Sequence, residues 1–510
     1  MNVCEYLLEK KNGNAPALLT LSGTYTFDDL ATASSRVAAF LAHSGGRKGD
    51  RVILLSDNGF FWTAAYLGTL RAGLVCVPLP SRIAGEDLAA IVSMTDPQFS
   101  FVESRALPAH APVLQETIIV SDCSPSVPGI SGLVGMQEVC SSRHANFVEP
   151  EDLSPDDLAA LMFTSGSTGK PRGVMVSHEN IIANTDSIIQ YLSLTAADRI
   201  LAVLPFHYCF GASLLHTHLR VGGSVVVEPR FMYPETVLDR MLETDCTGFA
   251  GVPSHYQILL RRSSVARRSF PRLRYMQQAG GHLAPTFVQE LRSVLPGTAF
   301  FIMYGQTEAT ARLCYLPPDR LEAKLGSVGG PIPGVRVSIL DAEGHEVKPG
   351  DIGELVAEGN NITLGYWNDP DATAKAFRNG KLHTGDLATI DEDGFIFIVD
   401  RANDFLKCGG KRVSCRWIED VLLQCDLLVE AAVIGIPDEI LGEAVKALVV
   451  LRDRGGDSLC PDVREFCRLH LPPFLVPKEI EVVSALPKNS AGKVMKQVLR
   501  QESRRSLVAT

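Results

Sequence analysis

Short apolar runs alternate with amphipathic stretches along most of the chain. The apolar run Arg51–Leu55 is typical of a buried strand, and the spacing of apolar residues in Phe60–Arg71 predicts a helix. A second strand-like run follows at Leu74–Pro78, and the same succession returns between Ile200 and Val227. Strands that alternate with helices favour parallel pairing. We therefore expect an α/β fold with a large N-terminal body of several packed, largely parallel sheets.

The pattern changes after Asp400. The elements expected there mix helices and strands over a short length, which is typical of a small α+β domain. We place the boundary so that residues 1–401 form the N-terminal domain and residues 402–510 form a small C-terminal domain. The expected C-terminal elements are a helix at Cys415–Gln424, strands at Glu430–Gly435 and Ala444–Leu451, a helix at Pro461–His470, a strand at Glu479–Val483 and a terminal helix.

The composition is that of a folded protein. The chain has 510 residues, which is too many for one ordinary core, so at least two domains are expected. Hydrophobic residues make up 46% and charged residues 21%, which argues against disorder. The net charge is −10 and no basic stripe interleaves with aromatic residues, so nucleic-acid binding is disfavoured.

The N-terminal segment does not have the pattern of a signal peptide. Its apolar residues are interrupted by Glu5, Glu9, Lys10 and Lys11. No run reaches the roughly 18 apolar residues that a membrane helix needs. We therefore expect no membrane span and a cytoplasmic location. The 12 cysteines include no Cys-x-x-Cys pair, so we expect buried small side chains in place of metal ligands.

The segment Thr164–Gly173 reads TSGSTGKPRG and follows the apolar run Ala159–Phe163. It is not a Walker A loop, because Thr164 stands where that loop needs glycine and Pro171 stands where it needs serine or threonine. A turn of this composition can present backbone N–H groups and hydroxyls to phosphate oxygens, and Lys170 adds a positive charge. A solvated glycine–serine loop explains the segment alone equally well, so a phosphate site needs support from other motifs.

Four further motifs offer groups that a nucleotide site needs. Tyr304–Glu308 (YGQTE) combines an aromatic ring for a purine, a hydroxyl for phosphate and a carboxylate for magnesium. At the ends of strand-like stretches, Asp386 in TGD can accept hydrogen bonds from ribose hydroxyls, and Arg401 in DR can support the same sugar. Lys493 lies on a glycine-containing turn, PKNSAGK, before the last helix. Each of these motifs is weak by itself.

The order of the motifs is specific. TSGSTGKPRG, PFH, AGG, YGQTE, TGD, DR and PKNSAGK follow one another along the chain. With this order the chain resembles the adenylate-forming superfamily, which includes acyl-CoA synthetases, aryl and aminoacyl adenylation domains and firefly luciferase; the resemblance extends from about Tyr25 to the last helix. It implies that a carboxylic acid and ATP, with Mg²⁺, give acyl-AMP and pyrophosphate, after which the acyl group passes to a thiol.

The resemblance also implies roles for residues at matching motif positions. Lys493 would bridge the carboxylate and the α-phosphate, where a cation screens the repulsion between two anions. Glu308 would bind Mg²⁺, Thr307 would lie near the α-phosphate, and Asp386 and Arg401 would hold the ribose. The other nucleotide contacts would come from the phosphate loop, Thr164, Ser165, Gly166, Ser167, Thr168, Gly169 and Lys170, and from Gly280, Gly281, Tyr304 and Gly305 around adenine.

In the family that the chain resembles, a mobile C-terminal domain alternates between an adenylation conformation and a thioester-forming conformation. We expect the hinge within Arg401–Asp404, at Asn403, where relatives often carry Asp or Lys. In the second conformation Lys407–Lys411 (KCGGK) would approach the site. Its two glycines would let a pantetheine arm pass close to the backbone.

The acid pocket is expected around the sequence PFHYCFG. Amino-acid-activating relatives carry an aspartate where Tyr208 stands, so an amino acid is disfavoured and stays an alternative. His207 is either a packed histidine or a group that closes over the acid carboxylate, and we expect the binding role. His216 and His218 are expected to be structural, because no carboxylate or cysteine completes a zinc site with them. A mainly apolar pocket favours a fatty, polyketide-like or aryl acid, and its expected walls are Phe206, His207, Tyr208, Phe210, Gly211, Val252, Ser254 and Val328.

The acyl acceptor is either coenzyme A or the phosphopantetheine of a separate acyl or peptidyl carrier protein, since no fused carrier domain is recognisable. The resemblance favours an acyl-CoA ligase, and an enzyme that loads a carrier protein is the alternative. The alternative from a different functional class is that the protein is a noncatalytic relative that binds a nucleotide. The presence of Lys493 and Glu308 argues against that alternative.

Overall fold

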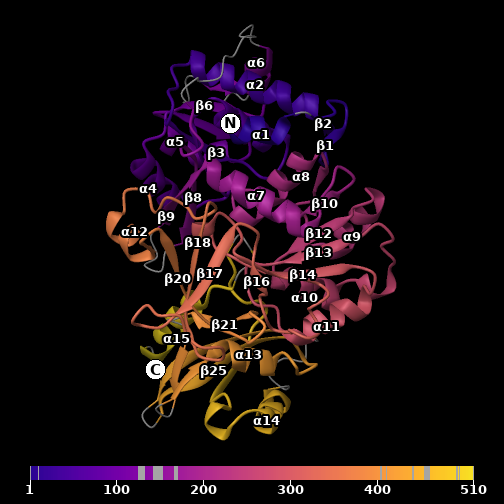
Figure 1. Cartoon of the computed structure of the whole chain (residues 1–510), viewed down its shortest axis with the longest axis vertical. Helices are drawn as coiled ribbons and strands as arrows, with labels where there is room; N and C mark the ends of the chain where they lie inside the picture. Colours follow the sequence, from indigo (N-terminus) through magenta and orange to yellow (C-terminus); the bar gives the residue numbers. More distant parts are fainter. Residues whose placement is uncertain are drawn as a thin grey trace.

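The computed structural model describes residues 2–9, 11–123, 133–141, 153–165, 171–401, 405–408, 411–438, 441–452, 460–489, 492 and 494–508. The N-terminal residues form one end of an elongated molecule, and a small C-terminal domain forms the other end (Figure 1). Within the described residues the strands form four sheets, of which three belong to the N-terminal body. The predicted α/β class is confirmed.

The first sheet carries the strand that leads into TSGSTGKPRG. Its strand order is β7-β6-β5-β3-β4-β8-β9, and neighbours are parallel except for β8 and β9. The expected strand Arg51–Leu55 and helix Phe60–Arg71 are confirmed with these bounds. The strands are β3 (Arg51–Leu55), β4 (Val75–Leu79), β5 (Phe99–Val102), β6 (Ile118–Ser121), β7 (Val134–Gly135), β8 (Leu158–Ser165) and β9 (Pro171–Ser177).

The second sheet has nine strands in the order β16-β15-β14-β13-β12-β10-β11-β1-β2. Its central strands, from β14 to β11, are parallel, so their carboxyl ends lie at one edge. The strands are β1 (Pro16–Leu19), β2 (Thr24–Thr26), β10 (Arg199–Ala202), β11 (Ser224–Val227), β12 (Gly248–Gly251), β13 (Tyr275–Gln278), β14 (Ala299–Tyr304), β15 (Cys314–Leu316) and β16 (Gly330–Pro331).

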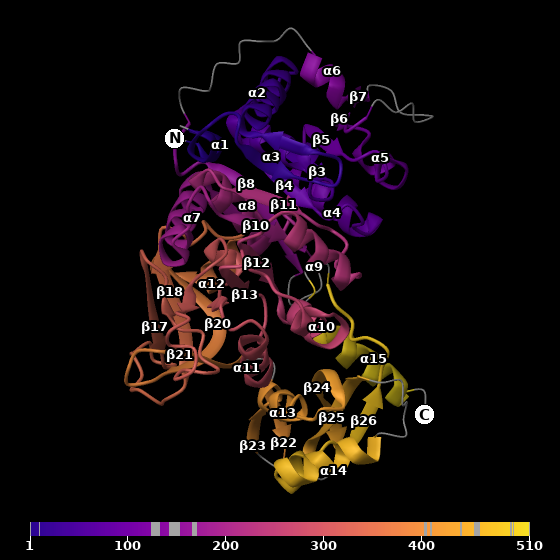
Figure 2. The same cartoon turned by 90° about the vertical axis from the view of Figure 1, so that its right-hand side faces the viewer.

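One apolar core joins these two sheets. It contains Val174 from the first sheet, Val225 from the second, Ile181 from the helix α7 (His178–Leu192) and Leu215 from the helix α8 (Cys209–Val221). The four side chains are almost completely buried. The two helices therefore tie the sheets into a single body, and Figure 2 shows them beside β8 and β10.

The third sheet is antiparallel throughout, whereas the sequence pattern predicted largely parallel sheets. Three of its connections contain no helix, as at Asp391, whose carbonyl accepts a hydrogen bond from Gly394 N at 3.1 Å, so these connections do not impose parallel pairing. The fourth connection, from β18 to β19, contains α12 (Pro370–Ala376). The strands are β17 (Val335–Leu340), β18 (Gly353–Gly359), β19 (Phe377–Arg378), β20 (Lys381–Ile390) and β21 (Ile396–Arg401).

The C-terminal domain has its own sheet and its own apolar core. Its elements agree closely with the predicted ones. The boundary proposed at residues 401 and 402 falls between β21 and β22, and Asn403 lies outside the described residues. The elements are β22 (Phe405–Cys408), β23 (Lys411–Ser414), α13 (Cys415–Leu422), β24 (Leu428–Asp438), β25 (Gly442–Leu451), α14 (Cys460–His470), β26 (Glu479–Val482) and α15 (Lys496–Val508).

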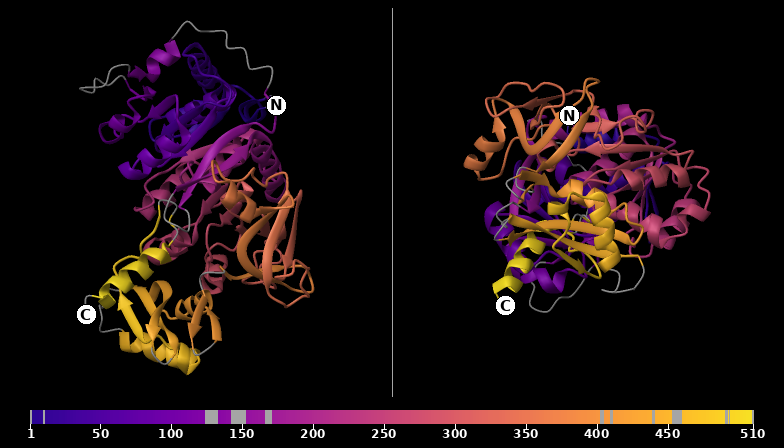
Figure 3. Two further views of the ribbon diagram at one scale, coloured as in Figure 1. Left: turned by 90° about the vertical axis from the view of Figure 1, so that its left-hand side faces the viewer. Right: turned by 90° about the horizontal axis from the view of Figure 1, so that it is seen from below.

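The remaining helices cover the sheets of the N-terminal body (Figures 1 and 3). None of the helices in the described part of the chain is long and apolar enough to cross a membrane. These helices are α1 (Val3–Leu8), α2 (Phe27–His43), α3 (Phe60–Arg71), α4 (Gly85–Thr95), α5 (Leu107–Leu114), α6 (Met136–Ser141), α7 (His178–Leu192), α8 (Cys209–Val221), α9 (Pro234–Glu243), α10 (Pro253–Arg262), α11 (Pro285–Val294) and α12 (Pro370–Ala376).

Two histidines of α8 are buried and hydrogen-bonded. His216 Nε2 lies 2.9 Å from Tyr66 Oη. His218 Nδ1 donates to Leu214 O at 2.9 Å, and its Nε2 accepts from Tyr275 Oη at 2.8 Å. Burial lowers the pKa of His216 to about 3 and that of His218 to about 4. Both histidines are therefore neutral at neutral pH, and their contacts are those of structural side chains.

We predict that the thermal unfolding midpoint falls as the pH is lowered from about 6.5 to about 4. In the unfolded chain the pKa of histidine is about 6.5, so the unfolded state binds protons in this range that folded His216 and His218 do not bind. Their contribution to stability is complete above this range and is lost as the pH falls through it. In a His216→Gln, His218→Gln double variant the thermal unfolding midpoint should fall less steeply with falling pH than in the wild-type protein. An equal slope in the two proteins would contradict this explanation.

Candidate active site

Several predicted site residues emerge at the same edge of the nine-stranded sheet. Gly251 pairs with Gln278, and Gln278 pairs with Ile302, so the parallel strands β12, β13 and β14 end side by side. Crevices at the carboxyl ends of parallel strands are common ligand sites in α/β proteins. Tyr304 is the last residue of β14, and the segments that follow the three strands contain the predicted residues Val252, Ser254, Gly280, Gly281 and Gly305.

Two glycines at this edge cannot be replaced without moving the backbone. Gly280 has φ +81°, and a Cβ there would lie 2.9 Å from Val252 Cγ1. A Cβ on Gly305 would overlap the carbonyl oxygen of Ala311. The positive φ at Gly280 and the close approach of the Ala311 backbone to Gly305 explain glycine at these two positions.

Tyr304 and Asp386 are in direct contact. Tyr304 Oη donates a hydrogen bond to Asp386 Oδ2 at 2.5 Å, and Asp386 is 5% exposed. Burial, followed by the Asp386 charge, holds the pKa of Tyr304 well above its usual range, so the hydroxyl keeps its proton. Asp386 also pairs with Arg401 across β20 and β21, which brings the two residues predicted for ribose side by side. The expectation that Asp386 lies at a strand end is wrong, because it lies within β20.

Glu308 is held from two directions. It lies in the short 3₁₀ helix Thr307–Ala309, which follows β14. Tyr366 Oη donates to Glu308 Oε1 at 2.8 Å, and Thr363 donates from its backbone N and from Oγ1 to Glu308 O at 3.0 Å each. The position of this carboxylate therefore depends on Tyr366, a residue that sequence reasoning did not select.

The phosphate-loop motif lies in an antiparallel hairpin. Thr164 pairs with Arg172, and Ser165 pairs with Pro171, at the adjacent ends of β8 and β9. Gly166, Ser167, Thr168, Gly169 and Lys170 lie outside the described residues. The guanidinium of Arg172 lies 4.8 Å above the ring of Tyr366 and forms an ion pair with Asp369 at 3.3 Å. Arg172, at the loop end of the hairpin, therefore connects this hairpin to Tyr366, which positions Glu308.

Asn58 fixes the backbone that leads to His207. Its Nδ2 donates to Leu204 O at 2.8 Å, and its Oδ1 accepts from Phe206 N at 2.7 Å. Sequence reasoning missed Asn58, because it lies 148 residues before Phe206 and in no motif. We propose that it positions the PFH segment.

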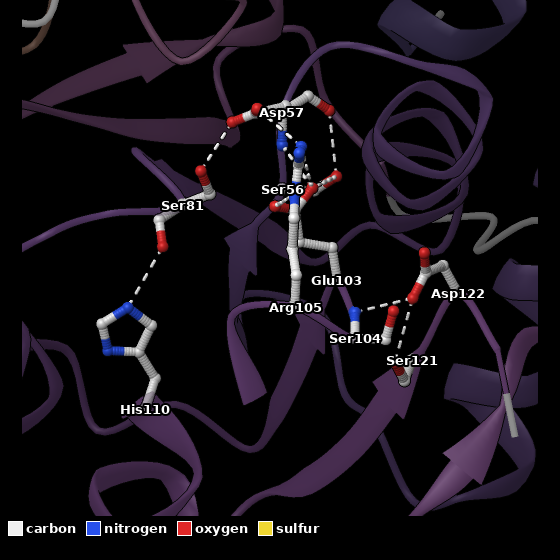
Figure 4. A network of polar contacts seen from close by, with 9 residues as sticks. All are labelled: Ser56, Asp57, Ser81, Glu103, Ser104, Arg105, His110, Ser121 and Asp122. Carbon is white, nitrogen blue, oxygen red and sulfur yellow. Dashed lines mark hydrogen bonds and ion pairs between the residues drawn. The ribbon is translucent and has the colours of Figure 1, made fainter. Parts of the chain in front are cut away.

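A polar network at the ends of β3, β4, β5 and β6 holds the loop that contains Asn58 (Figure 4). Asp57 Oδ1 accepts from Ser81 Oγ at 2.5 Å, Asp57 Oδ2 accepts from Arg105 Nη2 at 2.6 Å, and the backbone N of Asp57 donates to Glu103 Oε2 at 2.9 Å. Because Asp57 is fixed on three sides, the neighbouring Asn58 has little freedom.

His207 is largely enclosed and neutral. Its ring packs against Tyr208 with a centroid distance of 4.6 Å. Its Nε2 is buried and has no hydrogen-bond partner among the described residues. Burial lowers the pKa of His207 to about 4. The imidazole therefore offers an unsatisfied polar atom, which a bound molecule could pair with.

The other predicted pocket residues differ in their surroundings. Phe206 is completely buried and meets Trp62 edge to face at 5.3 Å. Gly211 lies against the Pro205 carbonyl so closely that a Cβ would overlap it. Val328 packs in the core of the third sheet. Beneath α8 lies a cavity lined by Phe206, Cys209, Ala212, Ser213, His216, Thr310 and Ala311, among others.

The C-terminal domain contacts this edge at two places. Ser254 Oγ donates to Gly492 O at 3.2 Å, and a Cβ on Gly492 would lie 3.0 Å from Val252 Cγ2. Gly492 immediately precedes Lys493, which lies outside the described residues. At the second place, His282 Nε2 donates to both carboxylate oxygens of Asp420 at 2.7 and 2.8 Å. Figure 2 shows the corresponding approach of α13 to α11.

The sequence and the fold are similar to those of known enzymes. A long-chain-fatty-acid–CoA ligase of Salmonella typhimurium is 31% identical over 523 residues, which cover 96% of this chain and 92% of that protein. The fatty acid–[acyl-carrier-protein] ligase ScoC of Streptomyces coeruleorubidus is 30% identical, with 94% and 93% covered. ATP-bound MatB from Rhodopseudomonas palustris is 30% identical and superposes with a TM-score of 0.87 over 98% of this chain and 99% of that chain.

Two family profiles match the chain. The profile described as AMP-binding enzyme matches residues 8–367, and the profile described as AMP-binding enzyme C-terminal domain matches residues 417–493. The first match covers more than half of the chain, and the two together include most of the predicted site. The chain therefore belongs to the AMP-binding enzymes of the adenylate-forming superfamily.

Proposed function

We propose that this protein is an acid–CoA ligase, which activates a carboxylic acid as acyl-AMP, releases pyrophosphate and transfers the acyl group to the thiol of coenzyme A. The observation that carries this proposal is the convergence of distant segments at one sheet edge. Three contacts make up this convergence: Tyr304 with Asp386, Tyr366 with Glu308, and Ser254 with Gly492.

In this proposal the nucleotide lies along the Tyr304–Asp386 contact. Gly280 and Gly281, in the segment that follows β13, would lie beside adenine. The Tyr304 hydroxyl orients the Asp386 carboxylate, which accepts hydrogen bonds from the ribose together with support from Arg401. Thr164, Ser165 and the loop residues from Gly166 to Lys170 then receive the β- and γ-phosphates at the end of the hairpin.

Glu308 fits a magnesium ligand. Its Oε1 is held by Tyr366, whereas Oε2 has no partner among the described residues and is available to a cation. Bound Mg²⁺ would offset the negative charge of the phosphates during attack by a carboxylate. Within the chain, Tyr366 keeps the carboxylate in one orientation, and Thr307 lies one residue before it for the α-phosphate.

The acid is proposed to lie between His207 and the turn that carries Lys493. The neutral imidazole can donate a hydrogen bond to the acid carboxylate without adding charge. The contact of Gly492 with Ser254 brings the C-terminal turn to the same edge, as adenylation requires. The proposal thus assigns this arrangement of the two domains to the adenylation conformation, and Asn403 to the hinge between conformations.

A carrier protein is the second candidate acceptor. The relative ScoC, 30% identical to this chain, is by its name a fatty acid–[acyl-carrier-protein] ligase, whereas the Salmonella relative is a CoA ligase. The two relatives are almost equally similar to this chain, so the acceptor needs a direct comparison.

A carboxylate panel tests the proposed function. We expect ATP-dependent pyrophosphate release with at least one fatty, polyketide-like or aryl acid, and acyl-CoA formation when coenzyme A is added. A parallel reaction with a phosphopantetheinylated carrier protein separates the two acceptors. Absence of pyrophosphate release with every acid, in protein that is folded and binds ATP, would refute the catalytic proposal in favour of a noncatalytic nucleotide-binding protein.

We predict that His282→Ala slows the adenylation half-reaction by about tenfold, as expected for loss of a charge-assisted hydrogen bond. Arg416 Nη2 donates to His282 Nδ1, so Nε2 carries the proton that Asp420 accepts, and burial lowers the pKa of His282. In this proposal the bond holds α13 against the loop after Gly281 in the adenylation conformation and is broken in the thioester-forming conformation.

The readout is the ratio of two rates, pyrophosphate release and transfer from supplied acyl-AMP to the thiol. His345→Ala is the matched control, since His345 is an exposed histidine in the connection between β17 and β18. An equal loss in both half-reactions would argue that His282 serves overall stability and not the choice of conformation.

A further inference from the structure

Arg312 is a completely buried arginine close to the proposed site. It is 1% exposed and lies four residues after Glu308. Its Nε donates to Met303 Sδ at 3.3 Å, its Nη1 donates to Ala311 O at 3.2 Å, and its guanidinium carbon lies 4.0 Å from the ring centroid of Phe210. Arginine is rarely buried without an ionic partner.

No aspartate or glutamate in the described part of the chain forms an ion pair with Arg312, and its Nη2 is buried without a hydrogen-bond partner there. A thioether is a weak acceptor, so its present contacts satisfy few of the five guanidinium donors. Other arginines in this body have carboxylates: Arg274, for example, pairs with Asp198 at 2.9 Å. Because arginine stays protonated, the Arg312 guanidinium is an uncompensated buried charge, which is strongly unfavourable.

The position of Arg312 connects it to the acid pocket. Phe210, beneath its guanidinium, is one of the predicted pocket walls. The neighbouring Cys209 lines the cavity under α8, and its Sγ lies 3.6 Å from Oγ1 of Thr307, the residue assigned to the α-phosphate. Ala311 lines the same cavity. Arg312 does not itself line the cavity, but it directly follows Ala311 in the chain and stacks on Phe210, which directly follows Cys209.

We propose that Arg312 is a specificity-determining residue that binds a second carboxylate, at the far end of the acid substrate. The proposal rests on the proposed function and narrows its substrate class to dicarboxylic acids. A carboxylate would satisfy two guanidinium donors at once and neutralise the buried charge. The hydroxyl of Tyr191 donates to Met303 Sδ at 3.0 Å, and its oxygen accepts a hydrogen bond from the guanidinium; a bound carboxylate would take over this place at the guanidinium.

The small size of the cavity limits the length of the diacid. Its open volume is 20 Å³, which holds about one water molecule. An acid that reaches the Arg312 guanidinium must therefore displace side chains around this cavity, and a short acid requires the smaller displacement. The preferred substrate is accordingly a short diacid with an apolar middle.

Matched pairs of substrates test this assignment. The straight-chain diacids from malonate to suberate are each compared with the monocarboxylic acid of equal carbon number, by pyrophosphate release. We expect the wild-type enzyme to prefer one short diacid over its monoacid. Arg312→Met should lower kcat/KM for that diacid by about 100-fold and leave the monoacid unchanged or improved, because only the diacid loses a charge-paired partner.

Arg220→Met is the control, since Arg220 also stacks on an aromatic ring, that of Tyr6 at 4.1 Å, on the N-terminal side of the body. If Arg312→Met does not fold, Arg312→Lys replaces it; it keeps the charge, and it should keep the diacid preference with weaker binding. A wild-type preference for monoacids, or an equal loss for all acids in Arg312→Met, would overturn the assignment.

Binding measured without turnover separates this inference from the proposed function. The preferred diacid should raise the thermal unfolding midpoint of the wild-type protein in the presence of AMP, and should do so less in Arg312→Met. If no acid releases pyrophosphate, the proposed function fails, yet this stabilisation still tests Arg312. If no diacid stabilises the wild-type protein, the assignment of Arg312 is wrong even when monoacids are activated.

Discussion

Lys493→Ala is expected to lower the adenylation rate by about 1,000-fold or more, while transfer of the acyl group from supplied acyl-AMP to the thiol continues. The reason is electrostatic: a carboxylate attacks an anionic phosphate, and a positioned cation stabilises charge that develops in the transition state. The contact between Gly492 and Ser254 supports this role, because it brings the residue before Lys493 to the edge where the nucleotide and acid motifs meet.

The measurement is the rate of each half-reaction, with pyrophosphate release for the first and thioester formation from acyl-AMP for the second. Lys488→Ala is the matched control. Lys488 belongs to the same segment, but its Nζ pairs with Glu430 at 2.9 Å, so its loss should affect both half-reactions alike through stability. Equal loss of both half-reactions in Lys493→Ala would contradict the proposed separation of the two conformations.

Glu308→Gln is expected to lower adenylation by about 100-fold or more and to raise the Mg²⁺ concentration needed for half-maximal rate. The amide keeps the shape of the side chain and can still accept from Tyr366, but it has lost the charge that attracts a divalent cation. The check is a Mg²⁺ titration of pyrophosphate release at saturating ATP and acid.

Two controls separate metal binding from orientation. Tyr366→Phe removes the hydrogen bond to Glu308 Oε1 and leaves the carboxylate, so it should cost roughly tenfold, with a smaller shift in the Mg²⁺ requirement. Glu179→Gln changes a carboxylate on α7 that accepts a hydrogen bond from Asn360 Nδ2 at 3.1 Å, and should leave the titration unchanged. If Glu308→Gln and Tyr366→Phe show the same Mg²⁺ dependence as the wild-type enzyme, Glu308 is not the magnesium ligand.

The sequence predicted elements well where their apolar pattern was strong and local. The strand Arg51–Leu55 and the helix Phe60–Arg71 have the predicted bounds, and the C-terminal strands and helices differ from prediction by a few residues. The third sheet was less predictable, because the direction in which two strands pair depends on the connection between them and not on their apolar content. Asp386 was likewise expected at a strand end and lies within β20.

The amino-acid sequence by itself determined the family and the chemical groups that are available to the site. YGQTE and TSGSTGKPRG are contiguous, so a ring, hydroxyls, a carboxylate and a lysine could be read in order without knowing the fold. The roles of Lys493, of Asn403 and of the loop from Gly166 to Lys170 stay predictions, since these residues lie outside the described parts of the structure.

Only the tertiary structure decided which groups meet. Tyr366 and Glu308 are 58 residues apart, and Asn58 and Phe206 are 148 apart, so no local pattern could pair them. The burial of Arg312 without a carboxylate is also invisible in sequence, where an arginine after YGQTEATA resembles any solvated charge. The physical reason is that burial and pairing depend on everything that packs around a side chain, whereas a motif records only its neighbours along the chain.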